Sequence, residues 1–210
     1  MSSFIPKNIE NYRKKEYWDE RYERFSHSPN NSESLDKDYE WFKSYADIKE
    51  HLSPFLSPSS RILVLGCGNS RLGQDLYQDG YQNVVNVDYS EVVIKNMKIK
   101  YPLIEWKVAD IRCMPCLADK SFDLIIDKGT IDALMCDNGD IWNPSDQVVS
   151  DVERTVSEVK RLLDKDGVFF YLTFGQPHFR KRFLEDSKIW DLQVIPLGIY
   201  FLYVMRIISK

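Results

Sequence analysis

Residues 61–70 read RILVLGCGNS, an aliphatic run followed at once by small and polar residues. The run Ile62–Leu65 predicts a short buried strand, and Gly66 and Gly68 allow the backbone after it to pass close to a ligand. A helix is predicted directly after this loop, over residues 71–80. A strand, a glycine loop and a helix N-terminus in this order are typical of a ligand-binding turn in an α/β protein.

Outward from this stretch, strands and helices alternate, which is the pattern of a parallel sheet covered on both faces. Further strands are predicted at Val84–Val87, Ile104–Val108, Phe122–Asp127 and Val168–Thr173, and helices are predicted from Ser90 to Lys100 and over Asp146–Leu163. A turn at Asp164–Gly167 introduces the fifth strand. The end of the chain differs, because Trp190–Ile195 and Ile199–Ile207 flank a Pro-Leu-Gly turn and predict an antiparallel hairpin.

Two helical patterns with aromatic residues precede the sheet. Aromatic side chains recur at three- and four-residue intervals over Tyr12–Phe25, and a similar apolar pattern covers Trp41–Leu52 before Pro54. A simple structural interpretation is that the apolar faces of both predicted helices pack in the core. The polar stretch Ser26–Lys37 between them has the composition of a mobile loop.

Length and composition limit the class of protein. The chain has 210 residues, 43% hydrophobic and 29% charged, which suits a single globular domain spanning residues 1–210. No apolar run approaches the roughly 18–20 residues of a membrane span, and the N-terminus lacks a signal-peptide pattern, so a cytoplasmic protein is predicted. The net charge of −4 opposes binding to a phosphate backbone, so no nucleic-acid partner is expected.

The cysteines give little support for a metal site. Cys113 and Cys116 have the C-x-x-C spacing of metal and redox motifs. A structural zinc site needs a second such pair, whereas Cys67 and Cys136 stand alone and the histidines share no ligand spacing. We therefore predict no metal.

Acidic residues stand at the carboxyl ends of the predicted strands, where open parallel sheets bind their ligands. Asp88 follows the second strand at a separation that suits a carboxylate accepting hydrogen bonds from ribose hydroxyls, and Tyr89 beside it suits the face of an adenine. Asp110 and Ile111 end the third strand and suit the amine edge and the face of the same base. Each acid alone is equally well explained as a helix cap or turn residue, but the succession indicates a nucleoside site.

The fourth strand ends with two more acids and a lysine, namely Asp127, Lys128 and Asp132, beside the first-strand loop if the two strands are neighbours. The glycine loop itself is weak as a motif. The dinucleotide fingerprint requires glycine or alanine where Arg71 stands, which disfavours a nicotinamide or flavin enzyme.

Together these residues resemble class I S-adenosylmethionine-dependent methyltransferases, and within them the subgroup that modifies translation elongation factor 1-alpha. The motifs that carry the resemblance are Tyr17–Tyr22 (YWDERY), Tyr39–Phe42 (YEWF), Ile62–Ser70 (ILVLGCGNS), Val87–Ser90 (VDYS) and Asp127–Leu134 (DKGTIDAL). The resemblance implies a Rossmann-like three-layer sandwich whose seven-stranded, mostly parallel sheet ends in an antiparallel hairpin. It also implies a helical cap over the cofactor, residues 1–55, and a Rossmann-like core, residues 60–210.

The resemblance further implies S-adenosylmethionine as the cofactor, with the N-terminal aromatic residues closing over it and Lys128 near the methyl donor. The implied cofactor-binding residues are Trp18, Tyr22, Trp41, Gly66, Cys67, Gly68, Asp88, Tyr89, Asp110, Ile111, Asp127 and Lys128. The sequence departs from the broader class in two places, since Val64 stands where an acid is common and Ser70 replaces the third glycine. These departures leave the anchoring of the cofactor's amino-acid end open.

The implied activity is methylation of a protein lysine, with elongation factor 1-alpha as the substrate and a monomer as the simplest assembly. Asp127 and Asp132 are the catalytic candidates, because a carboxylate can orient the amine and accept its proton. For Asp132 the structural alternative is an acid stabilised by a helix N-terminus. Methylation of a protein N-terminal amine or a small molecule remains open, as does a non-catalytic interaction module with the cofactor fold.

Overall fold

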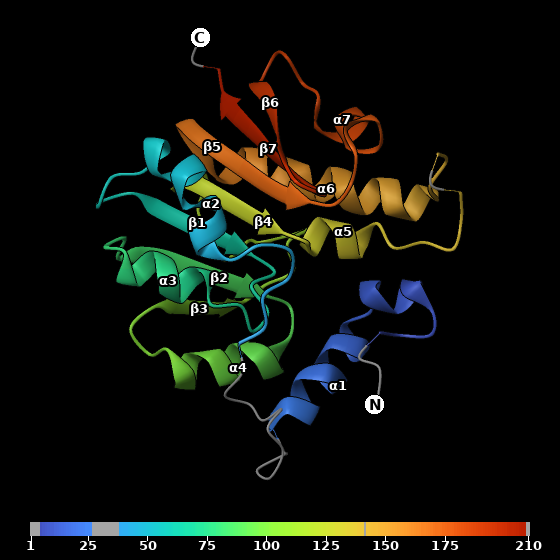
Figure 1. Ribbon diagram of the computed structural model, residues 1–210, viewed down its shortest axis with the longest axis horizontal. Helices are drawn as coiled ribbons and strands as arrows, with labels where there is room; N and C mark the ends of the chain where they lie inside the picture. Colours follow the sequence, from blue (N-terminus) through green and yellow to red (C-terminus); the bar gives the residue numbers. More distant parts are fainter. Residues whose placement is uncertain (1–4, 27–37, 141, 209–210) are drawn as a thin grey trace.

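A computed structural model of the chain describes residues 5–26, 38–140 and 142–208. Except for Ser26, the predicted loop Ser26–Lys37 lies outside the described residues. The described part contains a seven-stranded sheet with the order β3-β2-β1-β4-β5-β7-β6 (Figure 1). Its strands are β1 Arg61–Leu65, β2 Asn83–Asp88, β3 Glu105–Val108, β4 Phe122–Lys128, β5 Leu163–Thr173, β6 Trp190–Leu197 and β7 Tyr200–Ile207.

The sheet is parallel from β3 to β5 and antiparallel at β7 and β6. The predicted hairpin is confirmed, with Gly198 in the tight turn at a φ of 74°. Because β1 lies between β2 and β4, the strand order reverses beside β1, and the loop after Leu65 opens at this switch point. The topology therefore places the glycine loop where ligands of such sheets bind.

Helices cover both faces of the sheet. The helices are α1 Lys15–Ser26, α2 Tyr45–Leu52, α3 Leu72–Gln78, α4 Glu91–Lys100, α5 Thr130–Leu134, α6 Asp146–Leu162 and α7 Pro177–Leu184, with 3-10 turns η1 Ile9–Arg13 and η2 Ser53–Phe55. Alternation along β1 separates two buried clusters: Ile62 and Val64 pack with residues of α2, α3 and α4, whereas Leu63 and Leu65 pack with residues of α5 and α6. The predicted three-layer α/β architecture is thus present.

Two local predictions are wrong. The helix predicted from Trp41 begins only at Tyr45, because the Ser44 backbone N–H and hydroxyl donate to the Asp47 carboxylate at 2.8 and 2.7 Å, and Phe42 has a left-handed φ of 64°. The predicted turn at Asp164–Gly167 is instead an irregularity within β5, since Phe122 pairs with Leu163 and Leu124 with Val168.

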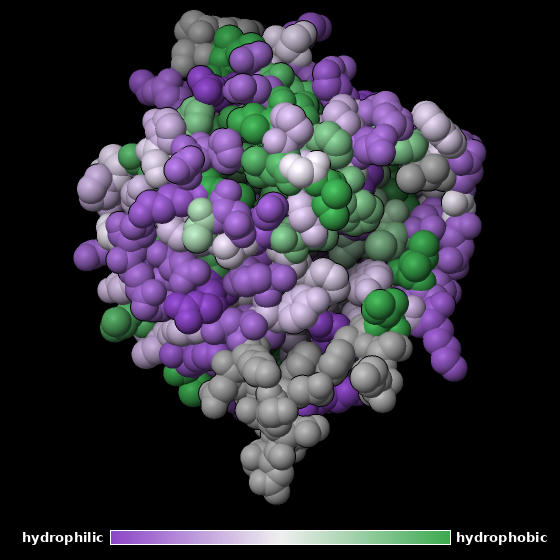
Figure 2. Space-filling model, in the orientation of Figure 1, coloured by the Kyte–Doolittle hydropathy of each residue, from purple (hydrophilic) through white to green (hydrophobic). Residues whose placement is uncertain are grey.

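The first α-helix, α1, lies at the carboxyl edge of the sheet (Figure 1). The Ser90 hydroxyl, at the N-cap of α4, donates to the Asp19 carboxylate of α1 and ties this helix to the core. Within the described ranges, no helix is both long and apolar enough to cross a membrane. Figure 2 shows mostly hydrophilic side chains on one face of the molecule, interrupted by apolar ones in the region where Figure 1 draws β5 and β7.

Candidate active site

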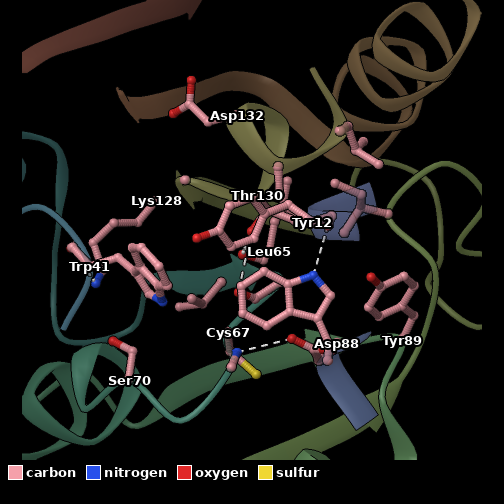
Figure 3. Close-up of a pocket in the computed structure, with 18 of the residues that line it drawn as sticks. Tyr12, Trp41, Leu65, Cys67, Ser70, Asp88, Tyr89, Lys128, Thr130 and Asp132 are labelled. Atoms are coloured by element: carbon pink, nitrogen blue, oxygen red, sulfur yellow. Dashed lines mark hydrogen bonds between the residues drawn. The ribbon is translucent and has the colours of Figure 1, made fainter. Parts of the chain in front are cut away.

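A cavity of about 440 Å³ opens at the carboxyl ends of β1, β2 and β4, beside η1 and α1. This volume suits a small organic cofactor. Trp41 and Lys128 lie at one side of the cavity and Tyr89 at the other, with Asp88 at its base and Asp132 beyond Thr130 (Figure 3). Most of the predicted cofactor residues therefore meet in one place.

The glycine loop is shaped for close approach of a ligand. Gly66 and Gly68 have φ values of 51° and 50°, which favour glycine. A Cβ on Gly66 would collide with the Thr130 side chain, and one on Gly68 would stand 2.9 Å from the Tyr22 hydroxyl oxygen. Because the Thr130 hydroxyl also donates to the Leu65 carbonyl at 3.1 Å, the loop packs directly on the end of β4.

Asp88 lies at the base of the cavity and is 5% exposed. Its carboxylate accepts the backbone N–H groups of Gly68 at 3.0 Å and Ser90 at 2.9 Å. Burial raises the pKa of Asp88 to about 6, against the opposing effect of those two N–H groups. Two N–H groups leave acceptor capacity on both oxygens, which is what a ribose diol requires. Burial likewise raises the pKa of the Cys67 thiol, so it stays protonated beside this carboxylate.

The N-terminal aromatic residues form a wall of the cavity. The Trp18 ring stacks on Tyr22 with centroids 5.9 Å apart, and its Nε1 donates to the Tyr12 carbonyl at 2.8 Å. Trp41 meets Trp18 edge-on at 6.2 Å. The Arg21 guanidinium lies 5.9 Å from the Trp18 centroid and 5.5 Å from that of Trp41. The Trp18, Tyr22 and Trp41 side chains line the cavity, so they are not confined to the core.

Glu40 is a site residue that the sequence reasoning missed. Its carboxylate accepts the Ser70 hydroxyl at 2.8 Å, the Arg71 backbone N–H, and the Lys128 ammonium at 2.7 Å. Lys128 also donates to the Trp41 carbonyl at 3.0 Å. Burial lowers the pKa of Lys128, and Glu40 opposes that shift. The segment Tyr39–Phe42 is one of the motifs that carry the family resemblance, but only the fold brings Glu40 to the ends of β1 and β4.

Asp110 and Ile111 lie at the cavity wall after β3, as predicted, but Asp110 has a partner that the sequence did not suggest. The Arg112 guanidinium donates to its carboxylate at 2.7 Å and to Asp151 at 3.1 Å. Burial acts to raise the pKa of Asp110, but the hydrogen bonds and charge of Arg112 outweigh it and lower the pKa. Asp110 thus stays ionised, with part of its acceptor capacity in use.

The two catalytic candidates lie in different environments. Asp127 is 0% exposed, accepts the Ile131 backbone N–H at 3.2 Å, and is absent from the described lining of the cavity. Burial, and then the neighbouring charge of Asp132, raise the pKa of Asp127 well above its ordinary value. Its contacts are those of a residue that caps α5.

Asp132 lines the cavity and is 5% exposed. Its Oδ1 accepts the Thr173 hydroxyl at 2.6 Å, the Arg180 guanidinium at 2.7 Å and the Tyr171 hydroxyl at 3.1 Å. Its Oδ2 has no hydrogen-bond partner in the part of the chain that the structure describes. A buried carboxylate oxygen without a donor is costly unless a ligand supplies one.

The cavity wall near Asp132 is otherwise largely apolar. It comes from η1, α5, the residues directly after α5 and the turn after β5, and includes Ile9, Tyr12, Leu134, Cys136 and Phe174. An apolar wall with one acid at its end suits an alkyl amine, whose methylene groups contact the wall while the nitrogen meets the carboxylate.

No metal-binding group of three or more histidine, cysteine, aspartate or glutamate side chains occurs among the residues described by the structure. Cys113 and Cys116 are exposed free thiols.

Comparison with known proteins identifies the family. Residues 56–196 match the family described as a methyltransferase domain. The chain belongs to this methyltransferase family. It is 39% identical to EEF1A lysine methyltransferase 4 of Mus musculus over 193 residues, which is 90% of this chain and 72% of that relative. It is 30% identical to the eEF1A lysine and N-terminal methyltransferase of Homo sapiens, over 86% of this chain but only 24% of that protein.

Solved structures show the same fold. A TehB-like SAM-dependent methyltransferase from Corynebacterium glutamicum superposes with a TM-score of 0.59 at 19% identity, covering 93% of this methyltransferase and 98% of that chain. A SAM-dependent methyltransferase from Methanosarcina mazei gives a TM-score of 0.56 at 18% identity, covering 76% and 98%. The predicted class I fold is confirmed, and S-adenosylmethionine is the cofactor, as the sequence resemblance implied.

The residues of this methyltransferase fit that cofactor. Gly66 and Gly68, whose φ values are positive, leave the loop backbone exposed to a ligand. The buried Asp88 carboxylate can still accept hydrogen bonds from a ribose. The aromatic side chains in the cavity wall offer ring faces to a sulfonium. Val64 is buried in the core at 2% exposure and supplies no polar group to the cavity. Glu40, by contrast, places a carboxylate beside Ser70 and Lys128 at the same end of the loop.

Proposed function

We propose that this methyltransferase transfers a methyl group from S-adenosylmethionine to a lysine amine of elongation factor 1-alpha, in the cytoplasm. The observation that carries this proposal is the Asp132 carboxylate in the cavity wall, with Oδ2 free of donors from the described residues. The names of the two relatives supply the protein substrate.

The positions of the side chains support the following cofactor roles. Asp88 accepts the ribose hydroxyls, while Tyr89 and Ile111 contact the faces of the adenine. Residues 1–55 act as a cap over the core at 60–210, with Trp18, Tyr22 and Trp41 closing on the cofactor. The full cofactor set comprises these residues with Gly66, Cys67, Gly68, Asp110 and Lys128, whereas Asp127 acts only by holding α5 in place.

When bound, S-adenosylmethionine supplies a methyl carbon that the amine lone pair attacks while the carbon–sulfur bond breaks and sulfur keeps its electron pair. The protein acts mainly by positioning, which provides up to about 7–11 kcal/mol in well-oriented reactions. The Oδ2 atom of Asp132 accepts an N–H of the amine and aims the nitrogen lone pair at the methyl carbon. After transfer the methylated amine carries an extra proton, which Oδ2 accepts and releases to solvent.

The test is methylation of recombinant elongation factor 1-alpha by the purified protein with isotope-labelled S-adenosylmethionine. We expect labelled methyl groups on a lysine, located by mass spectrometry of peptides. Elongation factor 1-alpha from cells that lack the protein should lose methylation at the same lysine. An unchanged methylation pattern in those cells, together with no labelling in vitro, contradicts the lysine assignment.

Methylation of a protein N-terminal amine is the second candidate, because one relative is named for both lysine and N-terminal activity. The Asp132 site accepts either amine on chemical grounds. The same mass spectra distinguish them, since the label then lies on the N-terminal peptide. Absence of any S-adenosylmethionine binding would instead favour a non-catalytic interaction module.

A further inference from the structure

A buried cation holds Asp132 from outside the cavity. Arg180 of α7 is 6% exposed and is not one of the described lining residues. Its Nη2 donates to Asp132 Oδ1 at 2.7 Å, and its Nε donates to the Tyr171 hydroxyl at 3.0 Å. Because Tyr171 donates to the same Oδ1 at 3.1 Å, Arg180 fixes one carboxylate oxygen directly and through a second side chain. The other oxygen, Oδ2, is buried and has no hydrogen-bond partner among the described residues.

The backbone after β5 makes room for this guanidinium. The Gly175 N–H donates to the Thr173 hydroxyl at 2.8 Å, and its carbonyl accepts the Tyr203 hydroxyl at 2.8 Å. A Cβ at position 175 would collide with the Arg180 guanidinium. The missing side chain at Gly175 is therefore what allows Arg180 to reach Asp132. Two features of the chain, a buried arginine and a glycine that accommodates it, serve this one contact.

Several elements place titratable groups around Asp132. They are Asp127 of β4, Cys136 after α5, Tyr171 of β5, Arg180 of α7, Tyr203 of β7 and, facing Cys136, Arg13 of η1. Burial acts to lower the pKa of Arg180, but Tyr171 and Asp132 raise it above its ordinary value, so the guanidinium stays charged. Burial, and then the charge of Asp132, raise the pKa of Asp127 well above its usual range, which favours the neutral form of this carboxyl. Asp132 and Arg180 are in direct contact as an ion pair, with Arg180 Nη2 2.7 Å from Asp132 Oδ1.

This balance matters for an amine substrate. A lone buried carboxylate favours the protonated form of a lysine, and an ammonium has no lone pair with which to attack a methyl group. We propose that Arg180 is a positioning residue for methyl transfer: its guanidinium balances the charge of Asp132, so that the acceptor amine binds at Oδ2 in its neutral, nucleophilic form. The lysine proton leaves to solvent on entry. This inference rests on the proposed amine acceptor.

The test is the pH dependence of kcat for methylation of recombinant elongation factor 1-alpha by the wild type, R180Q and R180K. The kcat profile reports groups in the enzyme–substrate complex, including the bound amine. We expect the wild-type midpoint to lie well below the ordinary lysine pKa of about 10.4. R180Q should move the midpoint upward by about one pH unit or more, and R180K should restore it, because lysine keeps the charge.

The affinity for S-adenosylhomocysteine, measured by titration, is the control. We expect it to be the same in R180Q and the wild type, because Arg180 lies outside the described cavity lining. If R180Q and the wild type have the same midpoint in the pH profile of kcat, the proposed role of Arg180 is wrong, but the proposed amine acceptor is unaffected. If the wild type does not methylate elongation factor 1-alpha, the proposed acceptor and this inference are both wrong. If R180Q does not fold, the wild-type profile decides the matter, since a midpoint near pH 10.4 contradicts neutral-amine binding.

Discussion

The two ends of the cavity are built in different ways. At the cofactor end, Asp88 is held by the backbone N–H groups of Gly68 and Ser90, which belong to the turns directly after β1 and β2. At the acceptor end, Asp132 is held by the side chains of Thr173 and Arg180, which are about 40 or more residues away in the chain. Local turns thus form one end, and a long-range network of side chains forms the other.

This difference indicates where the site tolerates change. Backbone N–H groups persist whatever the neighbouring side chains are, so the cofactor end depends on a few glycines and one acid. The acceptor end depends on several side chains at once, and each of these is open to substitution. We therefore expect variants to separate cofactor binding from methyl transfer.

The largest loss of cofactor affinity is expected at the contact between the turn after β1 and the start of α5, where Gly66 packs against Thr130. Gly66→Ala places a Cβ against Thr130 at a φ of 51°, so the turns after β1 and β4 must move apart. We expect at least about a 100-fold loss of S-adenosylhomocysteine affinity by calorimetry, from backbone strain and the collision together. Gly198→Ala is the matched control, because its φ is 74° but a Cβ there meets nothing within 4 Å. Equal affinities in the two variants would contradict the close packing of the glycine loop.

Asp132→Asn separates the two ends. The amide cannot accept the amine proton, and it weakens the charged contact to Arg180, so kcat should fall by about 100-fold, within the usual range for a general base. S-adenosylhomocysteine affinity should stay within about twofold. Asp123→Asn, at the opposite end of β4 and paired with Arg61, should keep wild-type kcat. A D132N enzyme with normal kcat would remove Asp132 from the mechanism.

Asp88→Ala is the complementary variant at the cofactor end. Loss of charge-assisted hydrogen bonds to a ribose typically costs about 1.5–3 kcal/mol, or roughly 10- to 150-fold in affinity. Asp110→Asn should weaken binding less, because Arg112 already engages that carboxylate. Calorimetric titration of both variants with S-adenosylhomocysteine tests the order. If D110N loses more affinity than D88A, the assignment of the ribose to Asp88 is wrong.

The difference between the two ends of the cavity also explains which parts of the site could be predicted from the sequence. The glycine loop, Asp88 and the Ser90 cap follow from short motifs at strand ends, so periodicity and turn chemistry are enough to find them. Seven strands and the terminal hairpin followed from the same signals together with the family resemblance. Trp41 lies in the cavity lining, and its assignment to a helix was wrong, because the Ser44 cap starts the helix later.

Long-range contacts escaped the sequence reasoning. Glu40 meets Lys128 and Ser70 across 88 and 30 positions of the chain, and nothing in the local pattern marks it as a partner. Arg180 begins the basic run Arg180–Arg182, a pattern that by itself indicates a solvated helix face, yet its side chain is buried against Asp132. Asp127 and Asp132 looked equivalent as acids near one strand end. Their separate roles follow from side-chain direction, which only the fold determines.

Cofactor affinity should depend on pH through Asp88, whose pKa burial raises to about 6. Ribose hydroxyls donate to the ionised carboxylate, so binding favours loss of its proton. Affinity should therefore be constant above about pH 7 and fall by up to about tenfold per pH unit below 6. Asp88→Asn should bind weakly at every pH with a flat profile between pH 5 and 7. An equally flat profile in the wild type would contradict the raised pKa.

The smallest effect is expected at Glu40, which joins the N-terminal segment to the end of β4. Glu40→Gln keeps an acceptor for the Ser70 hydroxyl and the Arg71 N–H but loses the charge that faces the buried Lys128. Partly exposed ion pairs contribute about 0.2–1 kcal/mol, so S-adenosylhomocysteine affinity should fall by at most about fivefold.

The control for Glu40 is Glu105→Gln, which removes the carboxylate of an exposed pair with Lys107 on β3 and should leave affinity unchanged. Glu40 belongs to neither of the two turns that hold Asp88, yet Lys128 lies beside the glycine loop. A loss of S-adenosylhomocysteine affinity in E40Q would show that a side chain distant in sequence also contributes to the cofactor end. Wild-type affinity in E40Q would show that only the acceptor end depends on contacts between distant side chains, as Asp132 does on residues of β5 and α7.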